Sequence, residues 1–189
     1  SSLMNENTKL LVIPHVSNIL GNVYDINKIT QLVKSININT RIYVDGVAYL
    51  AHKLIDVNIL NVDYYVVSFY KFLGLRISML YVKDSVLKEM SNLNHYFNTE
   101  SVDKLQIGGI QYELCSSIIG IKQYICDYLK KNKLSRNDIE IFFEKISNHE
   151  NLLINYFNQN EYILDSINVK ILTNPHIDRV PIFSLYSDT

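Results

Sequence analysis

Two apolar strands separated by an amphipathic helix are the feature that most constrains how this chain can fold. Residues 9–14 form an apolar run closed by a proline, and residues 41–44 form a second run that ends at Asp45. Between them Asp25 is positioned to cap a helix whose apolar residues recur at helical spacing, namely Ile26, Ile29, Leu32 and Val33. Strand, helix, strand is the signature of a right-handed parallel crossover. The sequence therefore predicts an α/β fold with a mostly parallel sheet.

Further elements continue this pattern towards the C-terminus. Strands are predicted at 63–68 and 78–82, and the connection between them could be a wide hairpin. The remaining predictions are helices over 84–93, 112–131 and 135–158, a polar loop over 94–104, and two late strands at 169–172 and 180–185, separated by residues 174–178. Ser135 with Asp138 has the pattern of a helix cap.

The edge of this sheet is the expected place for a ligand. In open α/β sheets ligands bind at the carboxyl ends of the strands, where Asp45 falls, and the hairpin would bring Lys71 to the same edge. Lys71 stands among aromatic residues, and burial there would lower its pKa and make the amine a nucleophile near neutral pH. Taken singly, such residues more often have no catalytic role. A lysine beside apolar residues usually extends its ammonium to water, and an aspartate at a strand end usually forms a turn. His52 and His15 would ordinarily be structural.

Composition excludes several classes of function. A net charge of −1 leaves no basic surplus for nucleic acid. No apolar run reaches the roughly 18 residues of a spanning helix, and the N-terminus does not read as a signal peptide, so we expect a cytoplasmic protein with no membrane contact. Cys115 and Cys126 are too few for a disulfide framework or a zinc site and are expected to pack in the core.

Three of these residues together match the requirements of pyridoxal phosphate. That cofactor needs a lysine for a Schiff base, a carboxylate that keeps its pyridine nitrogen protonated, and donors for its phosphate. Lys71 and Asp45 would meet the first two requirements. The hydroxyl of Ser68, three residues before the lysine, could donate to the phosphate.

An ordered series of segments resembles the class V aminotransferase and cysteine desulfurase family. The series consists of Ser-Asn-x-x-Gly at 17–21, Val-Asp-Gly at 44–46, His52, Ile-Asp-Val at 55–57, the lysine segment at 63–74, Ile-Gly-Gly-Ile-Gln-Tyr-Glu at 107–113 and Arg-Val-Pro-Ile-Phe-Ser at 179–184. It spans nearly the whole chain. A tyrosine directly before the lysine resembles the desulfurase-like branch, because desulfurases proper usually have histidine there.

The resemblance implies part of a fold-type-I large domain, with a mostly parallel sheet and helices, followed by the start of an α+β small domain. The expected divisions are a partial cofactor-binding domain at 1–133, a connecting helix at 134–160 and the start of the small domain at 161–189. Lys71 would be the Schiff-base lysine. The cofactor contacts implied are Asp45 at the pyridinium, together with Asn18, Ser68, Tyr70 and His52.

The implied activity is that of a carbon–sulfur lyase or an aminotransferase acting on a small amino acid. Ala48 stands where the family has glutamine or histidine against the cofactor, and Gly109 replaces a threonine that would reach across a dimer. The chain is also expected to lack the N-terminal half of the large domain and most of the small domain, so we expect an inactive isolated chain with weak or no cofactor binding. A homodimer, or a second chain that supplies the missing half of the site, would then be needed.

Two alternatives remain at the level of sequence. The chain could be a non-catalytic homologue or fragment that acts as a dimerisation or binding module, or an α/β domain with an unrelated role. A fragment of the family fold would leave strands 9–13 and 63–67 with an unprotected edge or face, so we expect dimers or larger species, or dependence on a partner chain.

Overall fold

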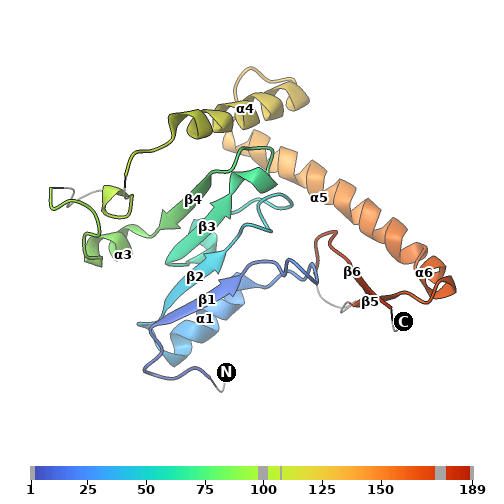
Figure 1. Cartoon of the computed structure of the whole chain (residues 1–189), viewed down its shortest axis with the longest axis horizontal. Coiled ribbons are helices and arrows are strands. Elements are labelled where there is room, and N and C mark those ends of the chain that lie inside the picture. Colours follow the sequence, from blue (N-terminus) through green and yellow to red (C-terminus); the bar gives the residue numbers. More distant parts are fainter. Residues whose placement is uncertain (1–2, 98–101, 107, 173–177, 188–189) are drawn as a thin grey trace.

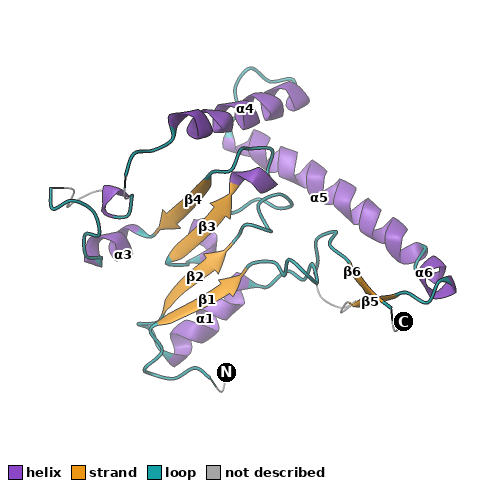
Figure 2. Cartoon of the chain, viewed as in Figure 1, coloured by secondary structure: helices purple, strands orange, loops and turns teal. Residues whose placement is uncertain are grey.

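The computed structural model describes residues 3–97, 102–106, 108–172 and 178–187, and Figure 2 shows its helices and strands. The elements, in chain order, are β1 (Leu10–Pro14), α1 (Ile26–Ile36), β2 (Arg41–Asp45), α2 (Val57–Leu60), β3 (Tyr64–Ser68), the 3-10 turn η1 (Phe69–Lys71), β4 (Ser78–Val82), α3 (Asp84–Glu89), the 3-10 turn η2 (Val102–Lys104), α4 (Tyr112–Leu129), α5 (Arg136–Gln159), α6 (Tyr162–Ser166), β5 (Lys170–Leu172) and β6 (Ser184–Tyr186).

The main sheet has the strand order β1-β2-β3-β4. β1 pairs with β2, and β2 with β3, in parallel, while β3 and β4 pair antiparallel. Both the parallel crossover and the hairpin predicted from the sequence are therefore confirmed. Figure 1 shows the carboxyl ends of β1, β2 and β3 directed towards α5, which runs diagonally from the top of the sheet to α6. β5 and β6 form a separate antiparallel pair near the C-terminus.

One face of the sheet is buried and forms the first core. α1 begins where predicted, because the Asp25 carboxylate accepts a hydrogen bond of 3.0 Å from the backbone N–H of Lys28. The residues buried in this core come from α1, from the inward faces of β2 and β3 and from the loop before β3: Ile26, Val33, Ile42, Val44, Val62, Tyr65 and Val67. The apolar residues that alternate along the strands thus pack against those that recur every three to four residues along the helix.

The opposite face and the two outer strands leave apolar side chains in solvent. Leu10 and Val12 of the edge strand β1 are 50% and 61% exposed, and Met79 and Leu80 of the other edge strand, β4, are 53% and 43% exposed. The expectation of an unprotected strand at 9–13 is confirmed. For residues 63–67 an unprotected edge is ruled out, because β3 lies inside the sheet between β2 and β4.

α4 and α5 pack on each other and form a second core. Its buried members are Phe72, Ile121, Ile125, Phe142 and Phe143. The predicted cap of α5 is present as a reciprocal capping box between Ser135 and Asp138. On α4 Cys126 is buried as expected, but Cys115 is only partly buried.

Several boundaries differ from the sequence prediction. α3 ends at Glu89 rather than near residue 93, because the buried Lys104 donates hydrogen bonds to the carbonyls of Leu87 and Met90 and so caps the helix. α2 and α6 were not predicted, since helices of four and five residues carry too little periodicity to be read. The predicted strand at 180–185 is shorter, and the turn expected at 174–177 lies outside the described residues.

Within the described part of the chain, the structure has no helix that is both long and apolar enough to cross a membrane.

Candidate functional site

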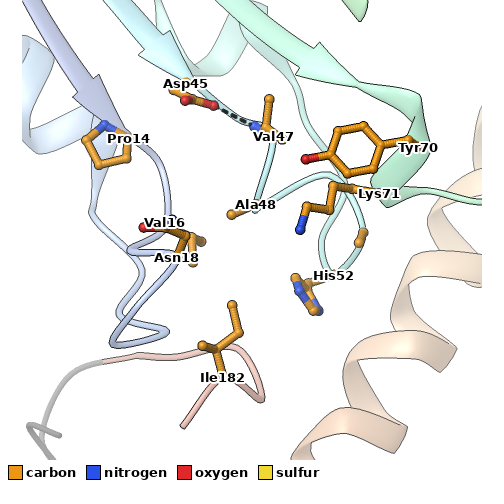
Figure 3. Close-up of a pocket in the computed structure, with 11 residues that line it drawn as sticks. Pro14, Val16, Asn18, Asp45, Val47, Ala48, His52, Tyr70, Lys71 and Ile182 are labelled. Atoms are coloured by element: carbon orange, nitrogen blue, oxygen red, sulfur yellow. Dashed lines mark hydrogen bonds between the residues drawn. The ribbon is translucent and has the colours of Figure 1, made fainter. Parts of the chain in front are cut away.

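A cavity of about 300 Å³ lies at the carboxyl ends of β1 and β2, as Figure 3 shows. Its walls come from four segments: the end of β1 with the following loop, the end of β2 with its loop, the turn η1, and the C-terminal segment. The lining residues are Pro14, Val16, Asn18, Asp45, Val47, Ala48, Ala51, His52, Tyr70, Lys71 and Ile182. This is the sheet edge where the sequence placed a ligand site.

Five of the six residues proposed from the sequence line this cavity: Asn18, Asp45, His52, Tyr70 and Lys71. The sixth, Ser68, lies outside the set of lining residues. It is buried at the end of β3, where its Oγ accepts a hydrogen bond of 3.0 Å from the hydroxyl of Ser78 on β4. The cavity also has walls that sequence reasoning did not single out, formed by Pro14, Val16 and Ile182.

Lys71 reaches the cavity from η1, the turn that links β3 to β4 (Figure 3). Its side chain is exposed, so the expectation that burial activates this amine is wrong for the structure described here. The aromatic residue that follows it, Phe72, is buried in the second core and does not cover the lysine. The ammonium lies 5.3 Å from the centroid of the Tyr70 ring, within the range of a cation–π contact.

Asp45 is held by its own backbone and by the loop that follows it. The carboxylate Oδ1 accepts a hydrogen bond of 2.9 Å from the N–H of Val47, and the backbone carbonyl accepts one of 2.8 Å from His15. Gly46 then donates to the carbonyl of Val66 on β3. A side chain at Gly46 would collide with the ring of Tyr65, so glycine is required at this close approach. These contacts fix where the carboxylate enters the cavity.

A buried cluster of three rings supports this strand end. The His15 imidazole stacks on Tyr49 with 3.6 Å between ring centroids, and its Nδ1 lies 2.6 Å from the hydroxyl of Tyr65. Burial, helped by the charge of Lys53 and opposed by Asp25, lowers the pKa of His15 from 6.5 to about 4. Burial also raises the pKa of Tyr65. Both partners of the hydrogen bond are therefore neutral at physiological pH.

His52 forms a contact that no local pattern in the sequence indicated. Its Nδ1 lies 2.6 Å from Oε1 of Glu150 on α5, and the two side chains are 19% and 15% exposed. The hydroxyl of Ser147, also on α5, donates to the backbone carbonyl of His52 at 3.4 Å. The partners are 98 residues apart in the chain, which is why only the tertiary structure reveals the pair.

The wall at Ile182 is formed by the C-terminal segment, which docks on the loop between β1 and α1. The N–H of Val180 donates to the carbonyl of Gly21 at 2.9 Å, and the N–H of Val23 donates to the carbonyl of Asp178 at 2.8 Å. Arg179 adds hydrogen bonds from its guanidinium and lies over the ring of Phe183. Residues far apart in sequence thereby close one side of the cavity.

Gly21 makes this docking possible, and we expect Gly21→Ala to loosen it. Gly21 has a φ of +73°, and an added Cβ would lie 2.6 Å from the carbonyl oxygen of Ile182 and 2.9 Å from that of Val180. We expect a loss of at least about 1 kcal/mol of unfolding free energy and faster tryptic cleavage after Arg179. Gly120→Ala is the matched control, because nothing lies within 4 Å of its added Cβ. Equal cleavage rates in the two variants would contradict the docking described here.

Comparison with known sequences identifies related proteins. The model of the Aminotransferase class-V family matches residues 1–117. An aminotransferase-like protein of Gibberella zeae is 39% identical over 125 residues, which cover 65% of this chain and 31% of that protein. A cysteine desulfurase-like protein of Aspergillus flavus is 36% identical over 127 residues, covering 64% of this chain and 29% of the relative.

Solved structures show the same fold. A cysteine desulfurase of Thermococcus onnurineus matches 97% of this chain and 45% of its own chain with a TM-score of 0.76 at 18% identity. A cysteine desulfurase of Escherichia coli matches 99% of this chain and 45% of its own with a TM-score of 0.75 at 17% identity. The chain thus spans about a third of the length of the two curated relatives described above and under half of these two structures.

Proposed function

Because this chain belongs to the class-V aminotransferase family, we propose that it binds pyridoxal phosphate through Lys71 and acts on a small amino acid. Members of this family and of the related cysteine desulfurases depend on that cofactor. The reaction proposed is that of a carbon–sulfur lyase or an aminotransferase. It is a proposal for the chain as part of an assembly, because these relatives are more than twice as long as this chain.

The main support for the proposal is that one cavity is lined by both an amine and a carboxylate. Lys71 and Asp45 come from different strand ends and line the same space of about 300 Å³. That volume is at the lower end of the range for small-molecule sites, which starts at roughly 300 Å³. The amine, the carboxylate and the neutral donors of Asn18 and Tyr70 are the groups that the cofactor requires, so the residues present fit it.

When bound, pyridoxal phosphate supplies an electron sink for bonds at the α-carbon of an amino acid. The Lys71 amine would be its point of attachment, and the Asp45 carboxylate would hold a proton on the ring nitrogen. Tyr70, Asn18 and His52 would orient the bound molecule. Ile182 would cover one side of the cavity and keep water from it.

A second candidate function is that of a non-catalytic binding or dimerisation module. Ala48 favours it, because its methyl group cannot make the polar contact to the cofactor that the family resemblance implies for this position. The exposed apolar residues of β1 and β4 also favour it, since such surfaces commonly bind a partner. A homodimer, or a second chain that completes the site, is the partner proposed in either case.

The domain division is part of the same proposal. Residues 1–133 would be the cofactor-binding part, 134–160 a connecting helix and 161–189 the start of a small domain. The position of α5 (Arg136–Gln159) and the separate pair of β5 and β6 support this division. A cytoplasmic location is proposed with it, because the two cysteines are too few for a disulfide framework and fit a reducing compartment.

Replacement of Asp45 by asparagine tests the proposal. Hydrogen bonds to charged groups contribute about 1.5–3 kcal/mol, so we expect Asp45→Asn to weaken binding of pyridoxal phosphate by about ten- to a hundredfold. Binding is measured by absorbance titration up to millimolar cofactor. Asp84→Asn, an exposed aspartate at the start of α3, is the matched control. Equal affinity of both variants would exclude Asp45 as the ring partner.

A further inference from the structure

The contact between His52 and Glu150 joins the wall of the cavity to α5. The Nδ1 to Oε1 distance is 2.6 Å, and both side chains are more than four-fifths buried. Ser147 lies three residues before Glu150 and donates a hydrogen bond to the carbonyl of His52, so the helix holds both the ring and the backbone of this residue. The orientation of the imidazole is therefore set by α5.

The contact with Glu150 determines which ring nitrogen of His52 carries a proton and which can accept one. An ionised carboxylate can only accept hydrogen bonds, so Nδ1 of His52 must carry the proton that it shares with Glu150. In the neutral imidazole, Nε2 then has a free lone pair. His52 lines the same cavity as Lys71 (Figure 3). Its imidazole, with this lone pair on Nε2, is therefore the side chain of the cavity best suited to accept a proton.

The other ionisable groups at the cavity are less suited to this task. Asp45 would be engaged with the ring nitrogen of the cofactor, and Lys71 with its attachment. Tyr70 stands under the ammonium of Lys71. A carboxylate behind an imidazole stabilises the imidazolium that forms when Nε2 takes a proton. Glu150 is so placed, whereas Lys145 and His149 of α5 line an adjacent hollow and are not among the residues that line this cavity.

We propose that Glu150 and His52 form a proton-accepting dyad for the amine of the amino-acid substrate. In the step proposed, a proton leaves the ammonium nitrogen of the amino acid and binds Nε2 of His52. The amino acid becomes a free amine, and the positive charge moves to the imidazole beside the Glu150 carboxylate. His52 is then the residue that touches the substrate, and Glu150 is a positioning residue that acts through it.

This inference rests on the proposed function for its substrate, but the dyad can be tested on the chain without cofactor. Long-range ¹H–¹⁵N NMR spectra of the chain with labelled histidine report which ring nitrogen carries the proton. We expect the Nδ1–H form for His52. In addition, diethyl pyrocarbonate transfers an ethoxycarbonyl group to unprotonated imidazole nitrogens. Peptide mass spectrometry gives the modification rate of each histidine at about pH 8, where imidazole is largely neutral.

Glu150→Gln keeps the size of the side chain and removes its charge, and we expect it to slow modification of His52 by about tenfold. Glu144→Gln, an exposed glutamate on the same helix, is the control and should leave the rate unchanged. His95, which is exposed and lines neither the cavity nor the adjacent hollow, serves as an internal reference in every sample. Thermal unfolding of each variant shows that the fold is retained, and Glu150→Asp provides a second variant if Glu150→Gln unfolds.

The results separate this inference from the proposed function. An Nε2–H form of His52, or an unchanged His52 rate in a folded Glu150→Gln variant, would overturn the dyad whatever the cofactor does. A tautomer and rate that agree with the dyad support it even in a chain that does not bind pyridoxal phosphate, because cofactor binding tests the proposed function and not the dyad. In a chain that binds the cofactor, Glu150→Gln should also slow the spectral change on adding an amino acid without altering cofactor affinity, and an unaltered rate would contradict the proton transfer.

Discussion

Replacement of Lys71 by alanine is expected to abolish covalent capture of pyridoxal phosphate. The chain is incubated with millimolar cofactor, reduced with borohydride and digested, and the labelled lysine is identified by mass spectrometry. Lys71 is the lysine that lines the cavity together with Asp45, so the wild-type chain should carry its label there. The reason for a complete loss is chemical, because alanine has no amine to react with the aldehyde.

Lys145→Ala is the matched control for this experiment. Lys145 lines the adjacent hollow on α5, where Lys71 is also a lining residue, but it does not line the cavity itself. Its replacement should leave labelling of Lys71 unchanged. Labelling spread over many lysines in the wild-type chain, with no preference for Lys71, would mean that the cavity does not select the cofactor and would favour the binding-module alternative.

The second large effect is a loss of stability at acidic pH, which we expect because His15 is buried in its neutral form. Its pKa is about 4 in the folded chain and 6.5 for the free side chain. Between these values the unfolded chain binds more protons, so stability is fully present above pH 6.5 and is lost as the pH falls towards 4. At 1.36 kcal/mol for each unit, the shift corresponds to about 3 kcal/mol of unfolding free energy.

Urea unfolding measured from neutral to mildly acidic pH checks this expectation. His15→Gln cannot titrate but can still form a hydrogen bond to Tyr65, so its stability should vary less with pH than that of the wild-type chain. His95→Gln, at an exposed position, should behave like the wild type. If His15→Gln and the wild type lose stability in parallel over this range, the histidine is not buried in its neutral form.

The sheet and its ligand-binding edge could be predicted because their signals are local. The proline that ends β1, the Asp25 cap of α1 and the apolar residues of β2 each lie within a few positions of the element they define. Once the parallel crossover is inferred, the rule for strand ends places Asp45, and the hairpin places Lys71 near it. The class-V family resemblance from the sequence is confirmed by the family match.

Other parts of the site depend on contacts that the sequence does not encode locally. Lys71 is exposed because of where the tertiary structure places the turn η1. The aromatic residues beside it in the sequence do not determine this exposure. The spacing of Ser68 to the lysine predicts a contact with the cofactor phosphate, and this stays a prediction: Ser68 is not a lining residue, and its Oγ accepts a hydrogen bond from Ser78 across the hairpin. Ile182 lines the cavity only because the C-terminal segment docks there, and Glu150 contacts the cavity residue His52 only because α5 packs beside it.

The strand order of the sheet follows the order of the chain, and this shapes how the cavity assembles during folding. Partners on β1 and β2, such as Leu10 and Arg41, lie about 30 residues apart. The contact of His52 with Glu150 spans 98 residues, and that of Ser184 with the carbonyl of Ile19 spans 165. Because longer loops cost more entropy to close and slow the formation of contacts, short-range strand pairing precedes these distant contacts. During synthesis, Asp45 and Lys71 therefore leave the ribosome before Glu150 and Ile182, so we expect the paired strands to form before the residues that complete the surroundings of the cavity are available.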